Sequence, residues 1–277
     1  MHLGLFVFAT DYSMPVDQLA VAAEDRGFDS IWLPEHTHIP ANRKTRYPGG
    51  GELPKEYSHT LDPFVGLAMA AGVTRRLKLA TGICLLIEHQ ALTLAKTVAT
   101  LDHLSGGRVL LGLGAGWNRE EMENHGTDYA SRFRKLEEQM LALKEIWTNE
   151  EATFDGEYER FEAIWSWPKP AQNPHPPLIL GGETDHTLRR IVRCGDGWLP
   201  RAMDPDRVLE GMARLHSFAR EAGRDPATIS VSPFAPPPKD AVIKRFEEAG
   251  ADRVILMIPP QNADDTLRRL DRYAAWT

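Results

Sequence analysis

The stretch that decides the fold is LDHLSGGRVLLGLGAGWNREEMENHG, Leu101 to Gly126. Its middle, from Arg108 to Leu111, begins an apolar run without alternation, which is typical of a parallel strand buried on both faces. Gly112, Gly114 and Gly116 then remove side chains where the strand leaves the sheet. Glycine there either permits positive φ or lets a ligand lie directly on the backbone. The stretch therefore predicts a strand whose C-terminal end leaves its backbone accessible.

This turn has three interpretations. A dinucleotide-binding fingerprint would need a third glycine at the position where the chain has Trp117. A purely structural glycine turn and a platform for a ligand remain, and the platform is favoured because other strand ends in the chain look similar. Beyond the turn, Asn118 is expected to cap a helix whose first turn holds Glu120 and Glu121, which suits the helix dipole.

An alternation of strand and helix runs through the whole chain. A helix pattern follows each of eight apolar segments. The helix after the second segment is expected to open at Asp62-Pro63, because Asp is a good N-cap and Pro is tolerated at the first helical position. The segments are His2–Ala9, Ser30–Leu33, Leu77–Leu86, the run from Arg108, Pro177–Leu180, Gly197–Pro200, Ile229–Pro233 and Arg253–Ile258. Eight such units predict a single α/β domain over residues 1–277, a (β/α)8 TIM barrel, with a doubly wound open sheet as the alternative.

Two segments interrupt this alternation. A polar loop rich in Pro and Gly, Thr37 to Ser58, is long enough to be a lid or a substrate loop. Residues Thr153 to Tyr158 contain an Asp-Gly pair that predicts a small hairpin with a type I′ turn.

Composition narrows the classes of partner. The net charge of −7, from 39 acidic and 32 basic residues, argues against nucleic acid or an anionic membrane, and an acidic substrate would need a local basic pocket. Cys84 and Cys194 are too few for a disulfide framework and fit a reducing compartment. The apolar start from Leu3 to Ala9 reads as a strand and not a signal peptide. We expect a soluble cytoplasmic protein.

The residues at the predicted strand ends form an unusual set. They include one histidine, one carboxylate, several bare glycines and large apolar groups: Phe8, Ala9, Thr10, Glu35, His36, Thr81, Gly82, Ile83, Gly114, Ala115, Gly116, Trp117, Gly181, Gly182 and Thr184. In a barrel these ends carry the function. The set offers too little acid and base for ordinary hydrolysis and suits a flat organic cofactor that brings its own chemistry.

Four segments carry a family resemblance. They are LPEHTHIP at 33–40, TLDPFVGLAMAAGVTRRLKLATGI at 60–83, LDHLSGGRVLLGLGAGW at 101–117, and PPLILGG with CGDGWLP within 176–200. In this order they resemble luciferase-like flavin-dependent oxidoreductases, and within that superfamily the branch linked to the deazaflavin coenzyme F420. The resemblance implies hydride transfer between F420 and a small organic substrate. The alternative is a monooxygenase that uses FMN and O2.

The resemblance also implies roles for residues. His36, with Glu35 beside it, would be catalytic at the reactive ring of the cofactor, and Gly82-Ile83 matches the position of a non-proline cis peptide that supports the ring. Gly181, Gly182 and Thr184 would bind the cofactor phosphate, and Gly114 and Gly116 would flank the ring or the ribityl chain. Phe8, Thr81 and Trp117 complete the expected cofactor-binding set. Trp117 replaces an acid of the F420-linked sugar-phosphate dehydrogenases, so their substrate is not expected here.

Further alternatives stay open. His36-x-His38 is similar to the metal pair of barrel hydrolases, but the later strand ends supply no further histidine, so no metal is expected. A flavin-binding protein without turnover is also possible within such a superfamily. The expected partners are a small-molecule substrate and a second copy of the chain in a homodimer.

Overall fold

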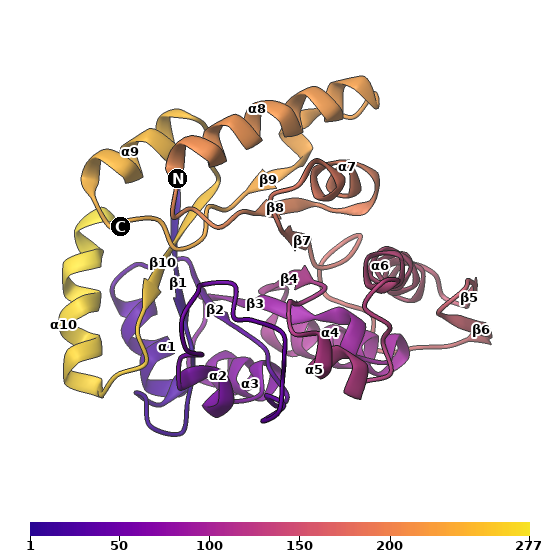
Figure 1. The fold of residues 1–277 in the computed structure, drawn as a ribbon, viewed down its shortest axis with the longest axis horizontal. Helices are drawn as coiled ribbons and strands as arrows, with labels where there is room; N and C mark the ends of the chain where they lie inside the picture. The colour runs from indigo at the N-terminus through magenta and orange to yellow at the C-terminus, as the bar shows by residue number, and fades with distance from the viewer.

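The computed structural model describes residues 1–277 and contains eight parallel strands joined by helical connections (Figure 1). The strands lie in the order β10-β1-β2-β3-β4-β7-β8-β9. Their bounds fall within a residue or two of the predicted ones: His2–Val7 (β1), Ser30–Leu33 (β2), Lys78–Leu85 (β3), Val109–Gly114 (β4), Leu178–Gly181 (β7), Gly197–Leu199 (β8), Ser230–Val231 (β9) and Arg253–Ile258 (β10).

The sheet curls until its first and last strands meet. β1 pairs with β2 on one side and with β10 on the other. Beyond β9 the chain continues alongside β10, where Ala235 N donates to Ile255 O at 2.8 Å and Ile255 N donates to Pro233 O at 2.9 Å. The predicted (β/α)8 barrel is confirmed. The doubly wound alternative is wrong, because the strand order follows the chain without the reversal such a sheet requires.

Helices cover the outside of the barrel (Figure 1). As predicted, Asp62 caps the helix after the second strand, accepting a hydrogen bond from Val65 N at 2.9 Å. None of the helices is both long and apolar enough to span a membrane. They are Val16–Asp25 (α1), Glu56–His59 (α2), Pro63–Val73 (α3), Ala91–Ser105 (α4), Arg119–Asn124 (α5), Arg132–Thr148 (α6), Asp185–Cys194 (α7), Pro205–Glu221 (α8), Asp240–Glu248 (α9) and Ala263–Tyr273 (α10).

The apolar core has two layers. The larger cluster lies between the strands and the surrounding helices. A smaller cluster fills the barrel interior, because alternate strand residues point inward. Its members are Phe6, Phe8, Trp32, Ala80, Leu110, Ile179, Leu199 and Ile255. Since large side chains fill the interior, a ligand has room only at the mouth.

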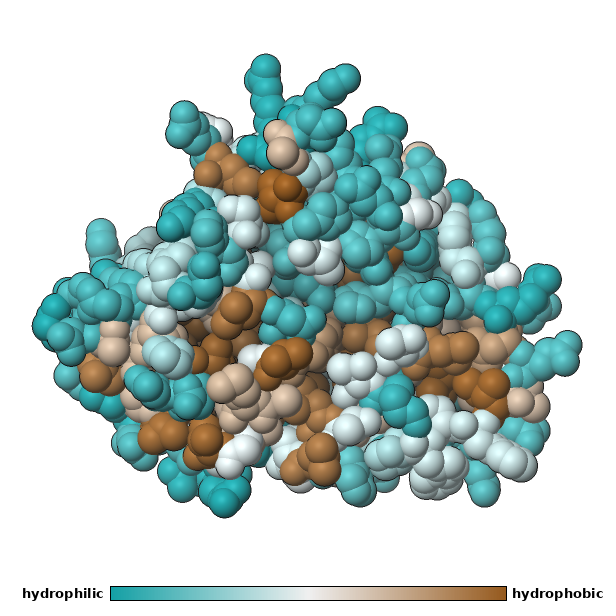
Figure 2. Space-filling view, turned by 90° about the horizontal axis from the view of Figure 1, so that it is seen from below, coloured by the Kyte–Doolittle hydropathy of each residue, from teal (hydrophilic) through white to brown (hydrophobic).

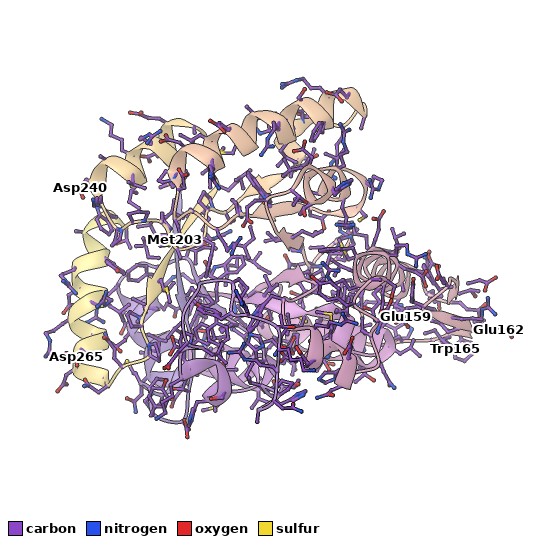
Figure 3. The ribbon with its side chains drawn as sticks, in the orientation of Figure 1. Glu159, Glu162, Trp165, Met203, Asp240 and Asp265 are labelled. Carbon is purple, nitrogen blue, oxygen red and sulfur yellow. The ribbon has the colours of Figure 1, made fainter.

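The hairpin of β5 (Ala152–Asp155) and β6 (Arg160–Ile164) extends away from the barrel, as the labels of Glu159, Glu162 and Trp165 show in Figure 3. The predicted type I′ turn is wrong. Asp155 pairs with Arg160, which leaves a longer connection between the strands, and Gly156 has no positive φ. The reason is a tertiary contact: the Glu138 carboxylate on α6 accepts hydrogen bonds from three consecutive backbone N–H groups of that connection.

An apolar stripe on the surface is centred on α3. Leu61, Val65, Met69 and Val73 recur every four residues, and each is 43% exposed or more. Figure 2 views the molecule from below Figure 1, where α2 and α3 lie, and shows hydrophobic side chains gathered on this face. Such a face is typical of an interaction surface. The homodimer stays a prediction.

The close approach of β3 and β4 can be tested by substituting Gly112. A Cβ atom at this position would lie 2.0 Å from Thr81 O on the neighbouring strand. We therefore expect Gly112→Ala to lower the free energy of unfolding by about 2 kcal/mol or more, since the strands must separate. The matched control is Gly72→Ala in α3, where a Cβ would meet open space; it should be neutral or stabilising by up to about 1 kcal/mol. Urea denaturation followed by circular dichroism measures both, and equal stability of Gly112→Ala and the parent would contradict the expectation.

Candidate functional site

His36 follows β2 at the barrel mouth and is held by a carboxylate from another part of the chain. Its Nδ1 lies 3.0 and 2.9 Å from the two carboxylate oxygens of Glu121 in α5. Both side chains are buried, with 6% and 1% exposed. Because a carboxylate only accepts, the neutral imidazole carries its hydrogen on Nδ1. Its Nε2 is then the atom that can take a proton and later give it back.

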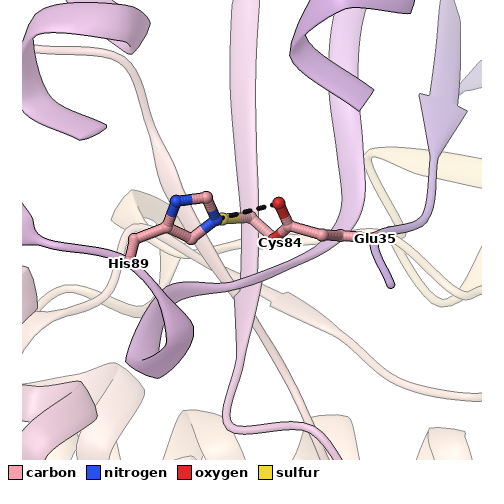
Figure 4. A group of neighbouring side chains, drawn as sticks. All are labelled: Glu35, Cys84 and His89. Carbon is pink, nitrogen blue, oxygen red and sulfur yellow. Dashed lines mark hydrogen bonds and ion pairs between the residues drawn. The ribbon is translucent and has the colours of Figure 1, made fainter. Parts of the chain in front are cut away.

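Glu35 is directed toward β3 and not toward the partner of His36. Its carboxylate accepts hydrogen bonds from Leu85 N at 2.6 Å and from His89 Nε2 at 2.8 Å, with the Cys84 thiol beside it (Figure 4). Burial tends to raise the pKa of Glu35, but the hydrogen bonds from His89 and Leu85 prevail and hold that pKa below its ordinary value. The structure therefore uses Glu35 to tie the end of β2 to the end of β3, which fixes the chain at His36.

Glu35, Cys84 and His89 also offer ligand atoms within 4.8 Å of one another, as a metal site would. Hydrogen bonds already satisfy both oxygens of Glu35. Burial raises the pKa of the Cys84 thiol well above its ordinary value, and the neutral thiol is a poor metal ligand. The group is therefore a hydrogen-bonded anchor. The rings of His36 and His38 also have different partners, since His38 contacts the side chains of Thr37 and Asn124.

A bulge in β3 forms a shelf at the mouth. The Gly82-Ile83 peptide is cis, as predicted, and the pairing with β4 shifts between Thr81 and Cys84. A Cβ at Gly114 would lie 2.1 Å from Ile83 Cδ1, and a Cβ at Gly181 would lie 3.6 Å from Ile83 Cγ2. Three strands thus contribute to a surface around Ile83, whose side chain packs into the space that Gly114 leaves free.

Thr81 lies deeper in the barrel wall. Its Oγ1 donates to Gly112 O at 2.8 Å, and the side chain is buried. This hydrogen bond joins β3 to β4 directly below the shelf, so Thr81 stabilises the site's support.

Aromatic rings surround His36. The ring centroids of Tyr57 and Trp117 lie 5.1 and 6.2 Å from that of His36, and Phe8 lies 4.7 Å from Tyr57. Tyr47 packs against both Tyr57 and Trp117. Phe8 and Trp117 were expected at this mouth, whereas the two tyrosines come from the loop with no motif. Together they make the surroundings of His36 apolar and largely inaccessible to water.

The loop between β2 and α2 is fixed to the mouth by α5. Glu120 Oε1 accepts hydrogen bonds from Lys44 N at 2.7 Å and Thr45 N at 3.2 Å. Arg43, Lys44 and Arg46 line a surface pocket of about 490 Å³ in this loop. The acidic protein thus has local positive charge beside its mouth, where an anionic ligand would need it.

The turn between β7 and α7 leads into the N-terminus of a helix. Gly182 has a φ of +112°, and Thr184 caps the helix by accepting a hydrogen bond from Thr187 N at 3.2 Å. The acidic neighbours Glu183 and Asp185 are each paired with an arginine, Arg201 and Arg214 respectively. A helix start with its acids neutralised can accept a phosphate.

Asn118 has an unpartnered amide. Asn118 occupies the predicted N-cap position before α5, but its side chain makes no capping hydrogen bond and is buried, with 1% exposed. Neither the nitrogen nor the oxygen of this amide has a hydrogen-bond partner. Buried amides are nearly always paired, so a bound molecule beside Trp117 would supply what is missing. The shelf, the helix start and this amide together fit a flat cofactor with an anionic tail.

Glu88, before α4, completes the polar side of the site. Burial and the charges of Glu121 and Glu35 raise the pKa of Glu88 to about 9, so the carboxyl is protonated at neutral pH. Its Oε2 has no hydrogen-bond partner and lies 3.6 Å from His125 Nε2. The sequence offered no local signal for Glu88, and it presented Glu121 only as an acid in a first helical turn.

The chain is similar to known proteins in sequence and in fold. The sequence model of the luciferase-like monooxygenase family matches residues 11–255. An uncharacterized protein of Mycobacterium tuberculosis is 41% identical, covering 99% of this chain and 98% of that protein. The F420-dependent hydroxymycolic acid dehydrogenase of the same organism is 29% identical, covering 76% of this chain and 55% of that protein. The crystal structure of monooxygenase RslO1 from Streptomyces bottropensis has a TM-score of 0.81 at 20% identity, with 99% and 98% of the two chains covered.

Glu88 makes the stability of the fold depend on pH. The folded state keeps this proton up to a pH of about 9, whereas an ordinary carboxyl loses it near 4.5. The folded state binds more protons between these values, so stability falls as pH rises, by at most about 1.4 kcal/mol per pH unit. Gln cannot lose a proton, so the free energy of unfolding of Glu88→Gln relative to the parent should rise across this window. Urea denaturation at several pH values measures it, with exposed Glu123→Gln as the control. A constant difference for Glu88→Gln would rule out the buried proton.

Proposed function

The chain belongs to the luciferase-like monooxygenase family, and we propose that it is an F420-dependent oxidoreductase that transfers a hydride between the deazaflavin and a small organic substrate. The observation that carries the proposal is the shelf of Ile83, Gly114 and Gly181 at the same mouth as the His36–Glu121 pair. Flat apolar support beside one proton-transferring group is what a cofactor with its own redox chemistry needs.

In this proposal each group at the mouth has a limited task. The cofactor, when bound, supplies hydride transfer. The backbone at Gly181 and Gly182, with Thr184, holds the phosphate, while Gly114, Gly116 and the amide of Asn118 border the ring or its side chain. Phe8, Tyr57 and Trp117 exclude water. His36 Nε2 holds or moves one proton at the substrate, and Glu121 orients the imidazole.

An FMN-dependent monooxygenase is the second candidate, since the family description names monooxygenases. The shelf suits either ring system. F420 is favoured by the relative that is named an F420-dependent dehydrogenase. Parallel titration of the purified protein with F420 and with FMN separates the two, and we expect tighter binding of F420. Binding of FMN alone would overturn the F420 proposal.

The phosphate site is tested at Gly182. Gly182→Asp places a charge and a side chain where an anion would bind, so F420 affinity should fall by about tenfold or more. Because Gly182 has a positive φ, Gly182→Ala is the matched control: it shares the backbone strain and lacks the charge, and should bind more tightly than the aspartate variant. Fluorescence titration measures both. If Gly182→Asp binds as well as the parent, the phosphate lies elsewhere.

The role of His36 is tested by its removal. His36→Ala should lower turnover by about 10² to 10⁴, the usual range for losing a general acid or base, and change cofactor affinity only a few-fold. His103→Ala, at an exposed position on α4, should retain full turnover. The measurements are substrate-dependent oxidation or reduction of F420 and cofactor titration. Unchanged turnover would remove His36 from the mechanism, and tightly bound stoichiometric metal in the parent would contradict the whole proposal.

A further inference from the structure

The pocket in the loop between β2 and α2 contains positive charge and no negative charge. Its volume of about 490 Å³ is within the range of sites that hold small organic molecules. Lys44 and Thr45 also line a second pocket, and the acids Glu120 and Glu123 line that one. The first pocket therefore keeps an excess of positive charge. Its seven lining residues are Arg43, Lys44, Thr45, Arg46, Tyr47, Gly50 and Gly51.

The cations of this pocket lack the acidic partners that other cations around the mouth have. Arg201 pairs with Glu183 at 3.0 Å, and Arg119 pairs with Glu123 at 2.6 Å. By contrast, none of the three cations in the pocket forms an ion pair with a carboxylate, and the Arg46 side chain makes no hydrogen bond either. In a protein with a net charge of −7, three neighbouring cations without partners are available to an anionic ligand.

Two residues of the pocket also belong to the aromatic surroundings of His36. The guanidinium carbon of Arg43 lies 5.7 Å from the centroid of the Trp117 ring, and the ring centroid of Tyr47 lies 5.9 Å from it. The ring of Trp117 is in turn 6.2 Å from that of His36. A molecule that reacts beside His36 can therefore lie along Trp117 with its other end in the pocket.

The backbone that carries the cations is held in place without a ligand. Glu120 Oε1 accepts hydrogen bonds from Lys44 N at 2.7 Å and Thr45 N at 3.2 Å, and the Arg43 guanidinium donates to Thr45 O. Because these contacts already order the loop, an anion would pay little for ordering it on binding.

We propose that this pocket binds the anionic group, a carboxylate or a phosphate, of an organic substrate whose apolar body packs against Tyr47 and Trp117. The guanidinium groups of Arg43 and Arg46 offer planar sets of donors that match such a group, and Lys44 adds a third positive charge. The aromatic rings suit an apolar body. The inference rests on the proposed function for the reaction of this substrate, whereas the affinity of the pocket for an organic anion is a property of the protein without cofactor.

The first test compares two fluorescent probes that share an aromatic body. Anilinonaphthalene sulfonate carries an anionic group, and phenylnaphthylamine lacks it. Combined Lys44→Gln and Arg46→Gln, both at exposed positions, should weaken binding of the sulfonate probe by about tenfold or more and leave binding of the neutral probe unchanged. Exposed Arg75→Gln, just beyond α3 and its apolar stripe, is the control and should bind both probes as the parent does. Parent-like affinity of the double variant for the sulfonate probe would overturn the pocket.

The second test separates the substrate from the cofactor as the source of the anion. The same double variant should bind F420 within a few-fold of the parent, because the cofactor phosphate is proposed to bind at Gly182. A fall of tenfold or more in F420 affinity would overturn the assignment to the substrate. If the parent binds no F420 and the double variant still loses the sulfonate probe, the proposed function fails and the anion pocket is supported. If F420 binds and the probe is unaffected, the pocket alone fails.

Discussion

The close approach of β3 and β4 is the constraint on which the mouth depends. Because position 112 is glycine, Thr81 O can occupy the space that a side chain at this position of β4 would need. The Thr81 hydroxyl also donates a hydrogen bond to Gly112 O. Directly above, Gly114 leaves room for Ile83. Any larger residue at these two positions would push β3 outward and remove the shelf. The glycines therefore act as spacers between strands.

Two carboxylate–imidazole pairs near the mouth have different structural surroundings. Glu35 and His89 form one buried pair that fixes the strand ends, and Glu121 and His36 form another at the mouth. Both pairs combine a carboxylate with an imidazole, yet only the second lies among aromatic rings at the opening. What distinguishes them is position in the fold, since the residue types are the same.

Most of the site's supports could be predicted because they depend on local geometry. The strand ends, the glycines and the N-cap at Asp62 follow from short motifs whose backbone requirements are specific. The cis peptide at Gly82-Ile83 was expected from the family resemblance alone. The errors arose where a distant residue overrides a local preference. Glu138 holds the hairpin connection open against the tendency of Asp-Gly to form a tight turn, and the buried Asn118 side chain makes no capping hydrogen bond although the residue is at the N-cap position.

The sequence by itself determined the barrel, because the alternation of apolar strands and amphipathic helices admits few architectures, and it determined which backbone segments meet at the mouth. Only the tertiary structure decided the chemistry there. Glu121 reaches His36 from 85 residues further along the chain, and Glu88 becomes a neutral acid because folding buries it beside two other carboxyl groups. Such pairings depend on distances between strand ends, and spacing along the chain does not encode them.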